Sequence, residues 1–248
     1  MKRGQVTIFV IIAIIIVVGL LGVIYLMAGE RVENVAVENP RQFIRKCVAD
    51  AVEDSIPIIL KNGGEINPSH TIMYRGEEYN YLCYQAEYYK NCINTHPMLK
   101  KIIEEEIRNY TIITVQSCFN NMREELENKG FDVSGEGASY SIDLVPGSVK
   151  VELRKNITIS KGESSQSIKI FDTYVNSPLY WLVDFARGII NDEATTCNKN
   201  YDEFILMYPD YNIGRVSYDF SKTYTIGDRN TGDEFKFAVR SCVLPPGL

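Results

Sequence analysis

QVTIFVIIAIIIVVGLLGVIYLMA, residues 5–28, is the stretch that decides how this chain is organised. It contains no charged residue, and a helix of about 24 residues is roughly 36 Å long, enough to cross a hydrocarbon core of about 30 Å. Lys2 and Arg3 precede it. Because these positive charges flank the short side, we expect residues 1–4 to form a cytoplasmic leader and residues 29–248 to lie outside the cell. The sequence therefore predicts a single-pass cell-membrane protein, held in the lipid bilayer by this helix.

The alternative is an export signal that is removed after use. Such a signal has an apolar stretch of about 7–15 residues, followed by a small-x-small cleavage site. Here the apolar stretch is longer, and Leu26-Met27-Ala28 places a bulky residue where a small one is required. We therefore expect the helix to be retained as a membrane anchor.

The charge balance and the absence of familiar motifs limit the classes of function. The chain has 26 basic and 32 acidic residues and a net charge of −6, and such a surface repels a phosphate backbone, so we expect no nucleic-acid partner. No phosphate-binding or dinucleotide-binding fingerprint is present. The two histidines, His70 and His96, lie in linkers without a nucleophile motif. We expect no cofactor and no enzymatic activity, with carboxylates distant in the chain as the open alternative.

The six cysteines all follow the predicted membrane segment, in an oxidising compartment where an even number favours disulfides. No Cys-x-x-Cys occurs, which argues against a metal site. We expect Cys83 to pair with Cys92 across a short turn. We expect Cys47 and Cys118, each on the apolar face of a predicted helix, to join those helices, which leaves Cys197 to Cys242. An exchange among Cys83, Cys92 and Cys118 is the alternative.

The patterns of apolar residues predict an α+β fold with antiparallel sheet. A helix is expected from Pro40 to Lys61, kinked or divided at Pro57, and a longer one from Pro97 to Asn128. Residues 29–130 should therefore be mainly helical, with a small hairpin at 72–84, and residues 131–248 should form an antiparallel sheet with one inserted helix. The expected later elements are strands at 139–144, 149–153, 156–160, 166–174, 204–208, 215–226 and 234–243, and a helix at 178–190.

Three further groups of residues are candidate surface features. Glu104-Glu105-Glu106 resembles an acid cluster, but consecutive helix positions diverge, so we interpret it as a solvated face. Asn109 and Asn156 each begin an N-glycosylation pattern. The Cys83–Cys92 interval is expected to be an exposed closed loop within a tyrosine-rich contact surface, since tyrosine suits contact sites; the alternative is that these rings pack the hairpin onto the domain. The tyrosines of this surface are Tyr74, Tyr79, Tyr81, Tyr84, Tyr88 and Tyr89.

The amino terminus resembles the class III signal of type IV pilins and archaeal flagellins. Lys2-Arg3-Gly4-Gln5, a polar Thr7 and the apolar helix carry this resemblance. It implies cleavage after Gly4, a mature chain that begins at Gln5, and packing of Gln5–Ala28 against copies of itself. The chain departs from the family pattern at Phe9, where many pilins have glutamate, and this departure bears on filament assembly.

The whole chain also resembles a group of membrane-anchored exported proteins from small-genome archaea. The shared features are the opening Lys-Arg-Gly-Gln, the Cys47 helix with Gly63-Gly64, the Pro97 helix with Cys118, and the terminal Asp228 with Phe235–Ala238. No activity comes with this resemblance. The sequence therefore predicts a surface-exposed structural protein, and the first resemblance implies a pilin-like subunit. The alternative is a tethered module that binds a protein or glycan.

Overall fold

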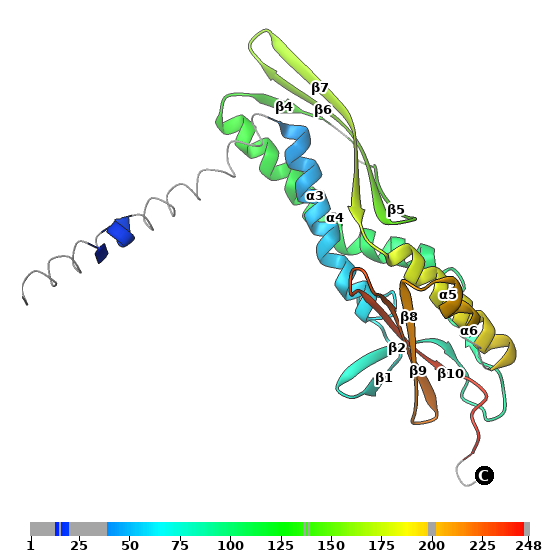
Figure 1. The fold of residues 1–248 in the computed structure, drawn as a ribbon. Helices are drawn as coiled ribbons and strands as arrows, with labels where there is room; N and C mark the ends of the chain where they lie inside the picture. Colours follow the sequence, from blue (N-terminus) through cyan, green and yellow to red (C-terminus); the bar gives the residue numbers. More distant parts are fainter. Residues whose placement is uncertain are drawn as a thin grey trace, which may run out of the picture.

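The computed structural model describes residues 13, 14, 16–19, 39–135, 137, 139–197 and 202–245. The predicted processing site at Gly4 and Gln5 lies outside the described residues, as does most of Gln5–Ala28. Within the described part of the chain, no helix has the length and apolar character needed to span a membrane. The fold is α+β, as predicted, with a six-stranded and a four-stranded sheet. Figure 1 shows the long helices between the sheets, with the start of α3 (Pro40–Lys61) at one end and the six-stranded sheet at the other.

Helix α3 (Pro40–Lys61) begins where the sequence indicates. The Asn39 side chain accepts a hydrogen bond from the Gln42 backbone N–H, and Pro40 occupies the first helical position. The helix continues through Pro57 to Lys61, so of the predicted kink or division at Pro57 the division does not occur. It ends before Gly64, whose φ of +100° favours glycine. A Cβ there would lie 3.0 Å from the Ile103 side chain, so α3 ends in close contact with the next helix.

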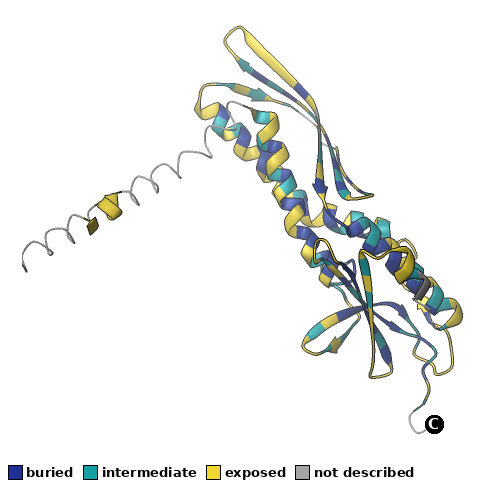
Figure 2. Ribbon diagram, viewed as in Figure 1, coloured by how far each residue is buried: buried dark blue, intermediate teal, exposed yellow. Residues whose placement is uncertain are grey.

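Helix α4 (Leu99–Asn128) is the longest described helix, as predicted, and it continues without a break through the β-branched residues 111–115. Its buried face faces α3, and the two helices are antiparallel, because Cys47 meets Cys118 while Gly64 meets Ile103. The shared apolar seam is part of one core that reaches both sheets. In Figure 2 the buried residues gather where the helices meet each other and the sheets.

The four-stranded sheet packs on α3 and α4 near the beginning of α3 (Figure 1). Strand β6 (Ser148–Lys161) pairs antiparallel with the other three, which are β4 (Asp132–Ser134), β5 (Ser139–Val145) and β7 (Ser164–Asn176). The sequence predicts two short strands where β6 is one. Its register against β7 shifts between Arg154 and Ile157, so an irregularity interrupts the pattern without ending the strand.

The six-stranded sheet has the order β1-β2-β10-β9-β8, with β3 also paired to β2. Its strands are β1 (Thr71–Tyr74), β2 (Glu77–Tyr84), β3 (Ile93–Asn94), β8 (Tyr211–Tyr218), β9 (Ser221–Asp228) and β10 (Glu234–Arg240). β2 and β10 are parallel, whereas the other pairs are antiparallel. The predicted hairpin therefore belongs to the same sheet as the last strands, and the expected division of the chain near residue 130 does not separate two sheets.

Two helices, α5 and α6, follow β7 and precede β8 in the sequence. Helix α5 (Leu179–Thr196) is longer than predicted and packs on α4 and on both sheets. Helix α6 (Asp202–Met207) replaces the strand expected at 204–208. Phe204 packs edge-on against Phe185 of α5 at 4.5 Å between ring centres, which fixes one side of this short helix against the longer one.

Candidate functional site

The three predicted disulfides are confirmed. Cys47–Cys118 joins α3 to α4, Cys83–Cys92 closes the loop between β2 and β3, and Cys197–Cys242 joins the end of α5 to the segment after β10. Their Cα–Cα distances are 6.1, 5.4 and 5.7 Å. Among the described residues, no group of His, Cys, Asp or Glu side chains could hold a metal ion.

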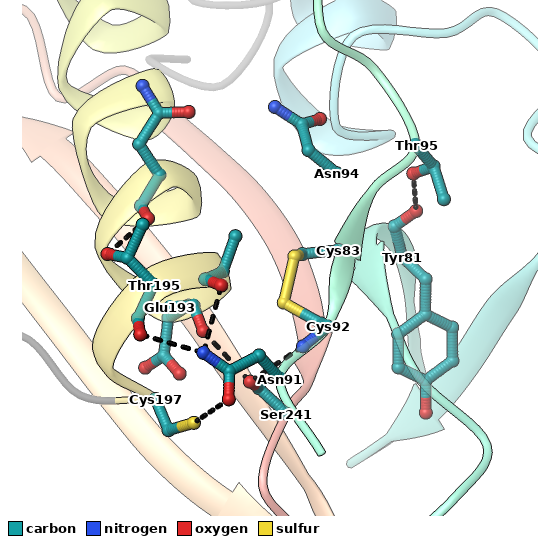
Figure 3. The surroundings of a disulfide bond; sticks show 12 residues. Tyr81, Cys83, Asn91, Cys92, Asn94, Thr95, Glu193, Thr195, Cys197 and Ser241 are labelled. Atoms are coloured by element: carbon teal, nitrogen blue, oxygen red, sulfur yellow. Dashed lines mark hydrogen bonds between the residues drawn. A yellow bond between two sulfur atoms is a disulfide. The ribbon is translucent and has the colours of Figure 1, made fainter.

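The loop closed by Cys83–Cys92 is held against the end of α5 (Figure 3). The Asn91 side-chain amide donates hydrogen bonds to the carbonyl oxygens of Ala194 and Thr195, at 3.1 and 2.7 Å. These carbonyls belong to the last turn of the helix, a position where carbonyl groups generally lack an intrahelical partner. Nearby, the Cys92 backbone N–H donates to Ser241 Oγ, which donates to the Glu193 carbonyl. The loop, α5 and the final segment therefore form one cross-linked unit.

The expected tyrosine contact surface is only partly present. Tyr79 and Tyr81 are 6 and 7% exposed and pack with Ala238 on the face of the sheet away from the main core. Burial raises the pKa of the Tyr81 hydroxyl, which hydrogen-bonds to Ser221 at 2.7 Å. The prediction is wrong for these two residues, because their rings pack against Tyr74 and Tyr84 and cover the second face of the sheet.

The remaining tyrosines divide into two pairs. Tyr74 and Tyr84 are half-buried at the margin of the same cluster. Tyr88 and Tyr89 are exposed, as expected for the closed loop, and residues 86–91 are exposed along their whole length. The predicted exposed loop is thus confirmed, and Tyr88 and Tyr89 are the members of the predicted contact surface that are exposed.

The other candidate residues occupy varied environments. Asn109 on α4 and Asn156 on β6 are both exposed. The three consecutive glutamates diverge, as expected, but only Glu105 lies on an exposed face. Glu104 accepts a hydrogen bond from the Leu144 backbone N–H, and Glu106 accepts one from Ile66. Two of the three carboxylates therefore attach α4 to neighbouring segments.

Strand β8 is the feature that the sequence does not reveal. It forms an edge of the six-stranded sheet, and β9 is the only strand paired with it in the described part of the chain. All eight residue pairs are in regular register. Natural sheets usually shorten, bend or cover such an edge. Here residues 214–218 are exposed.

The backbone of β8 has hydrogen-bonding groups along this edge that pair with no strand in the described part of the chain. A two-residue turn, Asp219-Phe220, joins Tyr218 to Ser221, and both turn residues have positive φ. In an antiparallel pair every second residue forms hydrogen bonds with the partner strand, and in a two-residue hairpin the first such residue is the one before the turn, Tyr218. The hydrogen bond from the Arg229 N–H to the Asp210 carbonyl, eight residues before Tyr218, fits this alternation. The N–H and C=O of Ser217 and Ile213 therefore point away from β9.

Apolar side chains surround this end of the strand. Tyr218 and Phe220 are each 47% exposed, and Val216 and Leu244 are also exposed. The turn and the final segment border a hollow of about 450 Å³, with Ser217 and Ser241 in its wall. We call Val216, Ser217, Tyr218, Phe220 and Leu244 the distal edge. It combines an open row of backbone groups with apolar surface, as sites for extended peptides do. Comparisons of the chain with models of protein families, with curated proteins and with solved structures find no match.

Proposed function

We propose that this chain is a membrane-anchored surface protein that binds an extended polypeptide segment of a partner at the distal edge. The observation that supports the binding is β8, a regular and exposed sheet edge. A bound strand would pair with the outward backbone groups of Ser217 and Ile213. Its side chains would contact Tyr218 and Phe220 and enter the adjoining hollow.

The membrane anchor in this proposal is Gln5–Ala28. Ile14, Ile16, Val17 and Val18 are helical, and each is more than half exposed. Moving apolar side chains at this density out of water lowers the free energy, and the lipid bilayer supplies an apolar environment for them. The anchor precedes α3 in the sequence, and Figure 1 shows the sheet that contains β8 at the other end of the body from the start of α3. A chain tethered in this way would present β8 outward, with its amino terminus in the cytoplasm.

Replacing Ser217 by proline is the direct test. Proline removes an outward N–H without removing a bond to β9, so the fold should persist while strand addition is lost. We expect a photo-reactive phenylalanine analogue at Phe220, in the full chain in its native membrane, to cross-link one partner. The cross-link should survive Ser217→Ala, which keeps the N–H, and should disappear in Ser217→Pro. Equal cross-linking in both variants, or none in either, would contradict the proposal.

A second candidate function is a pilin-like subunit, in which the same apolar helices pack against one another. The order of Lys2-Arg3-Gly4, Gln5 and the apolar run favours it. For this function we expect the mature chain to begin at Gln5, measured by amino-terminal sequencing or intact mass of the native protein. Gly4→Val should block the cleavage. A native chain that retains Met1 or Lys2 would exclude the pilin-like subunit and leave the tethered module.

A further inference from the structure

Lys155 occupies a position where the pattern of β6 calls for an apolar residue. Val149, Val151 and Leu153 precede it on alternate positions, and Ile157 and Ile159 follow, all buried on the face toward the helices. Lys155 continues this series at the point where the register against β7 shifts. Its side chain is half-buried, and the ammonium lies 4.6 Å from the centre of the Phe119 ring of α4.

Among the described residues, the ammonium has the Arg123 guanidinium as its charged neighbour and faces no carboxylate. Burial and, after it, the neighbouring Arg123 guanidinium lower the pKa of Lys155. Lys155 has no hydrogen bond or ion pair with a carboxylate among the described residues. Arg123 and Lys155 border the same small hollow, and a larger cavity of about 450 Å³ extends from Lys155 along α4 to Arg108. No acidic residue lines the larger cavity within the described part of the chain.

Without a ligand, the position of the Lys155 ammonium destabilises the folded chain. A half-buried ammonium loses hydration, and a second cation beside it adds repulsion. A contact with one aromatic ring offsets only part of that cost, and methionine would fill the same space without the charge. Acidic residues outnumber basic ones in this chain, yet the charged residues described in the lining of this cavity, Arg108 and Lys155, are both cations. An anionic ligand would supply the missing negative charge.

We propose that the cavity between α4 and β6 binds a small organic anion, with its carboxylate or phosphate at Lys155 and its apolar part against Phe119. Arg108 lies at the other end of the cavity, and its Nε donates to the Tyr140 carbonyl at 3.2 Å. The amides of Gln116 and Asn120 offer polar contacts along the wall between them. The volume is in the range of pockets that bind small ligands. This site is separate from the distal edge.

Isothermal titration calorimetry of the full chain in a neutral detergent tests the site with three probes. Phenylacetate and phenyl phosphate carry the two anionic groups, and phenylacetamide is the neutral counterpart of phenylacetate. We expect at least one anion to bind on the order of ten-fold or more tightly than the amide, because charge-assisted hydrogen bonds are the stronger ones. The anion that binds more tightly identifies the preferred group.

Lys155→Met should reduce the affinity for that anion on the order of ten-fold or more. The matched control, Lys101→Met, removes the same charge from an exposed position of α4 and should leave binding unchanged. The Lys155→Met chain should melt at the same temperature as the parent or higher, since the ammonium is poorly placed for stability. If this variant does not fold, Arg108→Gln at the other end of the cavity should still weaken binding.

Three results would overturn the site. The first is no binding of either anion at about 10 mM, a concentration at which even weak complexes are detected. The second is equal binding of the amide and the anions. The third is a Lys155→Met protein, or an Arg108→Gln protein where the former does not fold, that binds the anion as tightly as Lys101→Met.

Discussion

Replacing both Cys47 and Cys118 by alanine is expected to lower the free energy of unfolding by about 4 kcal/mol. The bond closes a loop with a sequence separation of 71 residues. A cross-link of this length removes many conformations from the unfolded chain, and their loss is the main source of its stabilisation. The bond also joins two antiparallel helices, so without it the α3–α4 seam depends on apolar contacts alone.

The Cys83–Cys92 pair supplies a matched control. Both of its cysteines are buried, but their sequence separation is only 9 residues. The same entropic argument gives about 2.5 kcal/mol for this short loop. Urea unfolding of the two double-alanine variants measures the difference directly. A loss for Cys83–Cys92 as large as that for Cys47–Cys118 would contradict the unfolded-chain account.

Local patterns in the sequence predict most of the helices and the disulfides. Cys47 and Cys118 fall on apolar faces of helical period, and packing those faces together brings the sulfurs into one seam. Helix α4 is long and strongly periodic, which is the pattern that sequence reasoning resolves best. The short apolar run at 204–208 lacks such length, and a run of that size fits a strand or a helix equally. It is α6 because its Phe204 side packs on α5.

Non-local pairing accounts for the larger errors. Nothing within residues 77–84 indicates a parallel partner at residues 234–240, because the pairing depends on how the whole chain folds back. The sequence does not predict the distal edge for a more local reason. Asp219-Phe220 contains none of the glycine or asparagine residues that signal a two-residue turn, yet both residues have positive φ. The sequence therefore predicts one strand at 215–226, where the structure has the end of β8, a turn and β9, and it does not indicate that β8 is an exposed edge.

Lys155 shows what a charged residue in an apolar series can indicate. Its alternation with Leu153 and Ile157 is visible in the sequence, but Lys155 falls between the two strands that the sequence predicts, 149–153 and 156–160. Only the continuous β6 shows that Lys155 faces the helices. The same reasoning applies to Tyr79 and Tyr81, because residue type alone does not tell which face of a sheet a side chain occupies.

Replacing Lys222 by methionine is expected to lower the free energy of unfolding by about 3–5 kcal/mol, because it leaves a buried carboxylate without its cation. Glu193 of α5 is 0% exposed. The Lys222 ammonium donates hydrogen bonds to both of its oxygens, at 2.9 and 2.7 Å, and the Tyr224 hydroxyl also donates to it. In the variant the methionine side chain still fills the space, but the Glu193 carboxylate loses the Lys222 ammonium and keeps the hydrogen bond from the Tyr224 hydroxyl.

The double variant Lys222→Met with Glu193→Gln separates the cost of an unpaired charge from the worth of the pair. Glutamine retains a hydrogen-bond acceptor for Tyr224 and carries no charge, so the double variant should be more stable than Lys222→Met alone. Arg187→Met is the matched control, since the Arg187–Asp184 pair is about half exposed on the same helix and such pairs contribute about 0–1 kcal/mol. Urea unfolding of the parent, Lys222→Met, Glu193→Gln and the double variant gives the coupling energy of the pair. A double variant no more stable than Lys222→Met would show that the buried charge is not what holds α5 to β9.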